Sequence, residues 1–313
     1  MEESFECSGL LHIPVMVEAV VDHLIRKSTR VIVDCTFGTG GHSLELLKRA
    51  PDSAFLIGID LDDEALEIGS RRLSQYMSRV LLKRANFGEI STILADYAGM
   101  VDALLIDCGV SRLQVMKPQR GFSFDREGPL DMRFDRSSQF DARKFLNRVS
   151  FEELSDLLLK FGEKRGREIA RAILERREKG TIRTTSDLAD AVKSVVRFKV
   201  AKSLARVFLA IRASTNRELE NLANALDSLP LLMNKGGRVC VISYHSLEDT
   251  IVKNAFKKLS GKCICPPGSL SCTCGKVEAF RVITKKPLKP GDDQIRRNPW
   301  ARSAKMRVME RCD

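Results

Sequence analysis

The chain has 313 residues, of which 43% are hydrophobic and 30% charged, with a formal net charge of +11. This length can bury one large core or two domains. No stretch approaches the roughly 18 apolar residues of a membrane span, and the start, Met1 to Glu6, is acidic where a signal peptide is positively charged. These features argue against a membrane-spanning or secreted protein and predict a cytoplasmic one.

The first apolar segment, Val31–Asp34, passes directly into a glycine-rich turn and then into a helical pattern. A short β-branched run followed by glycines is typical of a buried parallel strand. The turn contains Gly38, Gly40 and Gly41. Glycine has no Cβ, so the backbone can approach a ligand closely and present its N–H groups at the helix start. The pattern therefore predicts a cofactor loop, with a tight turn that binds nothing as the alternative.

The second apolar segment, Ala54–Asp60, ends in a carboxylate. Dinucleotide and S-adenosylmethionine sites both place an acid about 20 residues after the glycine loop, where it holds ribose hydroxyls. The dinucleotide fingerprint G-x-G-x-x-G fails, because Ser43 or Glu45 stands where its third glycine belongs. Asp34 before the loop and Asp60 after it favour S-adenosylmethionine as the cofactor.

Two further strands are predicted at residues 79–83 and 101–107, and helical patterns separate the strands. This alternation indicates a parallel sheet covered on both faces, with ligands at the carboxyl ends of its strands. Asp34, Asp60, Phe87 and Asp107 all fall at such ends, so we expect them to face one crevice.

From about residue 112 the pattern becomes a loop and then a block without strands. Helices are predicted there at 150–161, 167–179, 186–197 and 202–226, and Ser150 to Glu153 and Thr184 to Asp187 resemble the capping boxes that open helices. The sheet resumes at 236–244, and runs at 279–284 and 304–309 fit the antiparallel end of a seven-stranded sheet. The sequence thus predicts an α/β, Rossmann-like class I methyltransferase fold with an inserted all-helical domain. Its parts are a first cofactor segment (1–114), the helical insertion (115–220) and the rest of the cofactor domain (221–313).

Charge is distributed unevenly over these parts. Residues 1–114 contain 11 basic and 17 acidic residues, 115–220 contain 24 and 16, and 221–313 contain 17 and 8. A basic surface beside an acidic cofactor module predicts a polyanionic substrate, and therefore nucleic acid. The alternative is that the lysines and arginines only solvate helices.

Four of the nine cysteines gather in one short segment, as two C-x-C pairs: Cys263 with Cys265, and Cys272 with Cys274. Paired thiols across a turn can form a tetrahedral Zn²⁺ site, although C-x-x-C is the more usual spacing. Reduced loop thiols are the alternative, and disulfides are disfavoured in a cytoplasmic protein. The sequence alone assigns no metal here.

Longer motifs give the chain a family resemblance over nearly its full length. The motifs are His12-Ile-Pro-Val, Asp34-x-Thr-x-Gly-x-Gly-Gly-His-Ser43, Arg120-Gly-Phe-Ser-Phe, Gly128-Pro-Leu-Asp-Met-Arg133, Val241-Ile-Ser-Tyr-His-Ser-Leu-Glu-Asp249, Thr284-Lys-Lys-Pro287 and Asn298-Pro-x-x-Arg-Ser-Ala-Lys305. With these motifs the chain closely resembles the bacterial RsmH (MraW) methyltransferases. The resemblance implies methylation of N4 of a cytosine in the decoding region of 16S ribosomal RNA, with the small ribosomal subunit as partner. We infer no obligate protein partner from the sequence. It further implies S-adenosylmethionine contacts from Gly40, Gly41, His42, Asp60, Phe87, Asp107 and Gln114.

The proton-handling residues stay open. Asp107 can serve the cofactor or accept a hydrogen bond from the cytosine amine, and we favour the cofactor. His245 after the fifth strand and His12 near the start are candidates to position the base or accept a proton, with structural roles as the alternative. Stacking of a splayed base on Phe122, Phe124 or Tyr244 is a further possibility, although such residues mostly pack cores.

Two rival functions remain from the sequence. One is a methyltransferase for DNA or another RNA, although the chain lacks the Pro-Pro-aromatic motif that follows the fourth strand in many DNA amino-methyltransferases. The other is a non-enzymatic RNA-binding or ribosome assembly factor with a degenerate methyltransferase fold. The intact set of Asp34, Gly38, Gly40, Gly41 and Asp60 argues against degeneracy.

Overall fold

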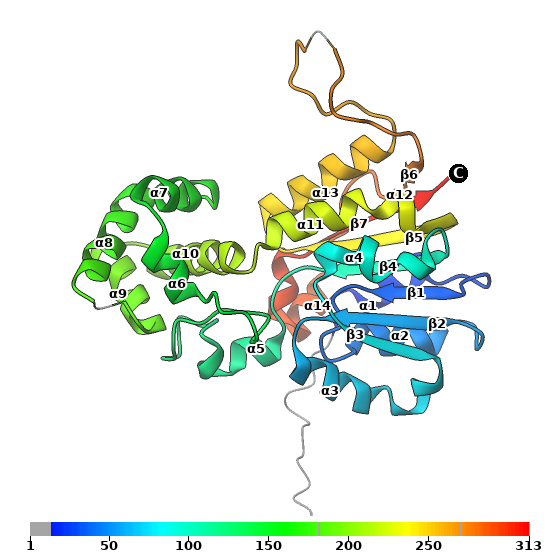
Figure 1. Ribbon diagram of the computed structural model, residues 1–313, viewed down its shortest axis with the longest axis horizontal. Coiled ribbons are helices and arrows are strands. Elements are labelled where there is room, and N and C mark those ends of the chain that lie inside the picture. The colour runs from blue at the N-terminus through cyan, green and yellow to red at the C-terminus, as the bar shows by residue number, and fades with distance from the viewer. Residues whose placement is uncertain (1–13, 181, 270, 313) are drawn as a thin grey trace, which may run out of the picture. The chain divides into compact units, whose positions relative to one another are not determined.

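One seven-stranded mixed sheet runs through the computed structural model, which describes residues 14–180, 182–269 and 271–312 (Figure 1). Its strands are β1 (Val31–Asp34), β2 (Phe55–Asp60), β3 (Val80–Arg84), β4 (Val101–Asp107), β5 (Met233–Ser243), β6 (Phe280–Val282) and β7 (Lys305–Arg311). The spatial order is β3-β2-β1-β4-β5-β7-β6. The first five strands are parallel, and β7 is antiparallel to β5 and β6. The predicted α/β fold with an antiparallel end is confirmed.

Both faces of the sheet are buried, because successive strand residues alternate between two hydrophobic cores. Val33 and Leu104 belong to one core, whereas their neighbours Ile32 and Leu105 belong to the other. The first core is covered by α4 (Ile90–Ile93), α11 (Glu218–Asp227), α12 (Leu229–Leu232) and α13 (Ser246–Leu259). The second is covered by α1 (Val17–Leu24), α2 (Gly41–Arg49) and α3 (Asp63–Arg72), on the opposite side of the sheet in Figure 1.

Shorter elements complete this part of the chain. They are η1 (Ser74–Arg79), η2 (Phe87–Glu89), η3 (Ala95–Tyr97), α14 (Asp292–Arg297) and η5 (Pro299–Ser303). Each helix in the described ranges is too short or too polar to cross a bilayer.

The chain divides into two compact units. The first comprises the described residues up to Gly109 and from Leu219 onward, and the second runs from Val110 to Glu218. The sequence placed the corresponding boundaries after residues 114 and 220. The second unit stands in the chain between β4 and β5, where the sequence predicted an insertion. Its role in substrate recognition stays a prediction.

The second unit is built from helices and loops, and residues 121–141 form its longest described loop. It contains α5 (Arg112–Met116), η4 (Pro118–Arg120), α6 (Ala142–Arg148), α7 (Phe151–Lys160), α8 (Gly166–Glu178), α9 (Thr185–Val195) and α10 (Val200–Thr215). The predicted capping boxes open α7 and α9, where Ser150 pairs with Glu153 and Thr184 with Asp187. Side chains such as Leu158, Ile173, Leu188 and Ile211 form a core separate from those of the sheet.

The single helix predicted over 202–226 is wrong, because the chain breaks between α10 and α11. The Asn216 side chain accepts a 2.8 Å hydrogen bond from the Phe134 N–H and donates one of 2.7 Å to the Met132 carbonyl. The next residue, Arg217, has a left-handed φ of 52°. The amide of Asn216 therefore pins a distant loop at the point where a continuous helix was expected.

Candidate functional site

Asp34 at the end of β1 is hydrogen-bonded to residues on both sides of the glycine loop. Its side chain is buried, and burial raises the pKa of its carboxyl group. One carboxylate oxygen accepts the Thr36 N–H at 3.2 Å, and the other accepts the Ser43 hydroxyl at 2.7 Å. Asp34 thus ties the start of the loop to the first turn of α2, and its contribution to cofactor binding stays a prediction.

The glycines of the loop occupy positions where a side chain would strain the backbone or clash with neighbouring atoms. Gly38 and Gly40 have φ values of 51° and 73°, in the left-handed region. A Cβ on Gly40 would lie 2.7 Å from Leu73 Cδ1, and one on Gly41 would lie 2.9 Å from Pro14 Cγ. At Gly38 the nearest described atom would be 3.9 Å away, so there is room for a ligand beside its backbone.

Asp60 at the end of β2 is hydrogen-bonded to this loop. The Gly38 N–H donates to one carboxylate oxygen at 2.7 Å, and the Asp62 N–H donates to the other at 2.9 Å. Burial raises the pKa of Asp60 to about 6, although both hydrogen bonds act to lower it. The side chain remains partly exposed. The structure therefore brings together the loop and the acid that the sequence predicts to hold ribose hydroxyls.

Phe37 is a part of this site that the sequence analysis missed. Its ring is 2% exposed and fills the space left by glycines on two other elements. A Cβ on Gly58 of β2 would lie 2.5 Å from Phe37 Cδ2, and one on Gly69 of α3 would lie 2.2 Å from Cε1. The usable signal was a glycine inside a strand and another inside a helix, since each marks a close approach by a neighbouring group.

Asp107 at the end of β4 links the loop to β5. Its N–H donates to the Thr36 hydroxyl at 2.7 Å, and its carboxylate accepts the Tyr244 hydroxyl at 2.8 Å. Burial and the charge of Asp107 raise the pKa of Tyr244, so the phenol stays a proton donor. The hydroxyl of Tyr244 thus orients Asp107, a role that the sequence analysis did not assign to it.

His42 on the first turn of α2 also lies beside Asp107. Its Nε2 is 2.9 Å from the Val15 carbonyl oxygen, and its Nδ1 is 3.7 Å from a carboxylate oxygen of Asp107. A carbonyl oxygen only accepts hydrogen bonds, so Nε2 carries the proton. His42, Asp107 and Tyr244 therefore form one cluster at the carboxyl edge of the sheet.

His245 has a structural position at the start of α13. Its Nδ1 accepts the Glu248 N–H at 3.4 Å, and its Nε2 lies 3.0 Å from a Glu248 carboxylate oxygen. Glu248 in turn accepts the N–H groups of Tyr244 and His245, which completes a capping box. A catalytic role for His245 stays a prediction. His12 lies outside the described residues.

Phe87 and Gln114 lie on different units. Phe87 opens η2 just after β3 and packs, partly buried, against the first core of the sheet. Gln114 lies in α5 of the second unit, where its side chain accepts the Ser111 N–H at 3.1 Å. Their contacts with the cofactor stay predictions.

Phe122 and Phe124 pack within the second unit. Phe122 stacks on Phe134 with ring centroids 5.7 Å apart, and Phe124 meets Phe208 edge-on at 5.6 Å. Both rings pack against the helical core, as phenylalanines usually do.

The model of the MraW methylase family matches residues 9–312. The chain belongs to this family. Three bacterial relatives are each called Ribosomal RNA small subunit methyltransferase H. The relative from Halothermothrix orenii is 40% identical to this chain, and those from Caldicellulosiruptor saccharolyticus and Fusobacterium nucleatum are each 41% identical. Each alignment covers 96% of this chain. It covers 99% of the first two relatives and 96% of the third.

The protein is therefore a methyltransferase whose cofactor is S-adenosylmethionine. The carboxyl edge of the sheet fits this cofactor in chemistry. The loop offers backbone room at Gly38, and Asp60 offers a carboxylate for ribose hydroxyls. Asp34, Asp60 and Asp107 give this edge an acidic character that suits a cationic sulfonium. Bound there, the cofactor would supply an electrophilic methyl carbon.

We expect cofactor binding to depend on pH through the raised pKa of Asp60. If ribose hydroxyls donate to the Asp60 carboxylate, as the sequence predicts, binding favours its deprotonated form. Because the pKa of free Asp60 is raised to about 6, affinity should be constant above about pH 7 and fall by up to about tenfold per pH unit below pH 6. Calorimetric titration with S-adenosylmethionine between about pH 5 and pH 8 measures this change in affinity. The control is Asp60→Asn, whose affinity should not change over this pH range. A flat profile in the wild-type protein would show that Asp60 does not bind the ribose.

Proposed function

We propose that this protein transfers a methyl group to N4 of a cytosine in the decoding region of 16S ribosomal RNA, in the small ribosomal subunit. The observation that carries the proposal is the near full-length likeness to the relatives named above, whose printed name is that of a small-subunit ribosomal RNA methyltransferase. The arrangement of Gly38, Asp60 and Asp107 at one edge supports the methyl-transfer part of the proposal.

The chemical task is mainly one of alignment. The exocyclic amine of cytosine is a poor nucleophile, because its lone pair is delocalised into the ring. Holding the amine in line with the methyl carbon and the sulfur contributes up to roughly 7–11 kcal/mol. In our proposal Asp107, fixed by Tyr244 and by the Thr36 hydroxyl, holds the cofactor side of this line. The base is bound as a splayed nucleotide, since an amine inside a helix cannot reach the site.

A basic cavity of about 860 Å³ in the first unit supports an RNA substrate. It opens between α13 and β6, and one acidic residue, Glu278, contributes to its lining. Its basic lining residues are Lys253, Lys257, Lys262, Arg281, Lys285 and Arg307. Arg281 is ion-paired with Glu310 and Arg307 with Asp249, so we expect mainly the lysines of this set to contact phosphate groups of a nucleic acid backbone.

The second unit presents an exposed aromatic ring among cations, which we expect to stack on an unpaired base. Phe198 is 77% exposed and lies between Arg197 and Lys199. The ammonium group of Lys199 is 5.1 Å from the centre of the ring. Base stacking on an aromatic side chain contributes about 1–3 kcal/mol, so Phe198→Ala should weaken binding of a 16S RNA fragment about tenfold at fixed salt.

The control for Phe198→Ala is Met100→Ala, which removes another exposed apolar side chain, 54% exposed, just before β4. Filter binding should show unchanged RNA affinity for Met100→Ala. S-adenosylmethionine affinity should be unchanged in both variants. Equal RNA affinity of Phe198→Ala and the wild-type protein would remove Phe198 from the RNA surface.

The proposed reaction is tested with small subunits isolated from cells that lack the modification. The protein is incubated with them and a methyl-labelled cofactor, and the labelled nucleotide is mapped by mass spectrometry. The proposal expects label on N4 of one cytosine of 16S RNA. Label on protein, on DNA or on another base atom would contradict the substrate. RNA binding without any label would favour the assembly-factor alternative.

A further inference from the structure

The loop between α13 and β6 has no hydrophobic core of its own. It projects away from the sheet in Figure 1. Its base is closed by a bridge between Ser260 and Glu278 and by the Gly261 N–H, which donates to the Val277 carbonyl at 2.9 Å. Beyond this base, the described residues from 262 to 278 include no buried side chain. A connection of this length without regular structure is uncommon in a compact fold, and apolar packing does not hold it.

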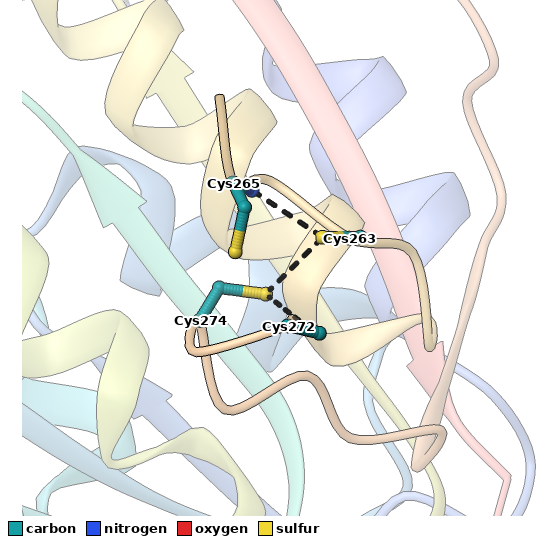
Figure 2. Close-up of side chains that lie close together, drawn as sticks. All are labelled: Cys263, Cys265, Cys272 and Cys274. Atoms are coloured by element: carbon teal, nitrogen blue, oxygen red, sulfur yellow. Dashed lines mark hydrogen bonds between the residues drawn. The ribbon is translucent and has the colours of Figure 1, made fainter. Parts of the chain in front are cut away.

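Four thiols converge inside this loop, as Figure 2 shows. The sulfur atoms of Cys263, Cys265, Cys272 and Cys274 all lie within 4.8 Å of one another. The Cys274 sulfur is 3.9 Å from that of Cys263 and 3.4 Å from that of Cys272. Sulfur atoms bound tetrahedrally to Zn²⁺ at about 2.3 Å lie about 3.8 Å apart. The observed spacings therefore approach those of a metal site.

The C-x-C spacing explains how two short segments supply four sulfurs. The turn that begins at Pro266, where the Ser269 N–H donates to the Pro266 carbonyl at 3.2 Å, brings the chain back so that the two pairs meet.

Backbone N–H groups point at these sulfurs, as they do at metal-bound thiolates. The Cys265 N–H donates to the Cys263 sulfur and the Thr273 N–H donates to the Cys265 sulfur, both at 3.4 Å. Such donors would stabilise the negative charge of metal-bound thiolates.

We propose that Cys263, Cys265, Cys272 and Cys274 bind one structural Zn²⁺ ion that holds this loop together. Four sulfur ligands leave no open position, which is the pattern of a structural rather than a catalytic zinc site. Binding displaces the thiol protons to solvent, since the thiolate is the ligand. Four thiolates and one Zn²⁺ leave a net charge of about −2. Lys262 and Lys276 flank the cluster, and residues 261–277 contain no acid to oppose them.

The first test is the metal content of the purified chain. The protein is equilibrated with ZnCl₂ under reducing conditions, desalted and analysed by elemental mass spectrometry. We expect about one Zn per chain in the wild-type protein and about one-tenth or less in Cys272→Ser. Cys312→Ser, which removes an exposed thiol outside the cluster, should keep the full content. Equal zinc in Cys272→Ser and the wild-type protein, or zinc in neither, would overturn the proposal.

Substitution by Co²⁺ identifies the ligands. The wild-type and Cys312→Ser proteins should develop the visible bands of tetrahedral cobalt together with thiolate-to-metal charge transfer, and Cys272→Ser should not. Coloured iron in the protein as isolated, displaced by neither metal, would contradict the choice of zinc. Disulfides between the four cysteines would likewise contradict the zinc proposal. They would have to be present both in protein prepared without reductant and in cell extracts quenched with acid, as detected by mass spectrometry.

Loop order gives a readout that does not depend on enzymatic activity. Lys262 and Lys276 are trypsin sites at the two ends of the cluster. Removing zinc with a strong chelator should speed cleavage at these lysines at least about tenfold, and adding zinc back should reverse it. Affinity for S-adenosylmethionine should stay unchanged in Cys272→Ser, which shows that the sheet is folded. Cleavage rates that are the same with and without zinc would contradict a structural role.

Discussion

Replacing Asp60 by alanine should abolish measurable binding of S-adenosylmethionine while leaving the fold intact. The carboxylate lies at the end of β2, fixed by the N–H groups of Gly38 and Asp62 at 2.7 and 2.9 Å. Its hydrogen bonds to ribose hydroxyls would be charge-assisted, and each contributes about 1.5–3 kcal/mol. Loss of two such bonds predicts an affinity at least about 100-fold weaker, measured by calorimetry.

The matched control for this variant is Asp52→Ala. Asp52 is an exposed aspartate that precedes β2, near the opposite end of the same strand. Its removal should change neither cofactor affinity nor the circular dichroism spectrum. If Asp60→Ala bound S-adenosylmethionine as tightly as Asp52→Ala does, the ribose would have to lie elsewhere.

The largest effect on stability is expected from Phe37→Ala. The ring is 2% exposed and fills the space beside Gly40, Gly58 and Gly69, so its loss leaves a cavity that none of these glycines can fill. Removing a buried phenylalanine costs about 3–5 kcal/mol. Because Phe37 supports the loop from which Gly38 contacts Asp60, cofactor affinity should fall as well.

Urea unfolding, followed by circular dichroism, measures this loss, and Phe198→Ala is its control. Phe198 is 77% exposed, so the same substitution there should change the free energy of unfolding by less than about 0.5 kcal/mol. The two variants should also separate the two binding functions. Phe37→Ala should weaken binding of the cofactor, and Phe198→Ala should weaken binding of RNA. A free energy of unfolding for Phe37→Ala within about 1 kcal/mol of the wild-type value would show that the ring does not support the loop.

The elements that sequence reasoning located are those whose signals are local. The parallel strands show as short apolar runs, and Asp34, Asp60 and Asp107 show as the polar residues that end three of these runs. Because parallel strands end at one edge, their convergence followed from strand direction alone. The capping boxes at Ser150 and Thr184 were readable for the same reason, since a box lies within four residues.

Contacts between distant residues were not readable in this way. The break after α10 depends on Asn216 binding a loop more than 80 residues away, which helical periodicity does not reveal. The pair of Tyr244 and Asp107 joins residues 137 positions apart. The packing of Phe37 against Gly58 and Gly69 requires the positions of β2 and α3. In each case the contacting residue is distant in the sequence, and only the tertiary structure reveals it.

The four-cysteine loop was only partly readable from the sequence. Its two C-x-C pairs were visible in the sequence, but spacing alone left zinc and reduced thiols as alternatives. The meeting of all four sulfurs within 4.8 Å is a property of the folded loop, and it is what favours the metal.

The most direct measurement of the central claim is a crystal structure of the protein with S-adenosylmethionine bound. The account predicts the ligand at the carboxyl edge of the sheet, with its ribose hydroxyls on the Asp60 carboxylate and the backbone of Gly38 beside it. A ligand bound elsewhere, or an edge blocked by the chain itself in crystals grown with saturating cofactor, would contradict it.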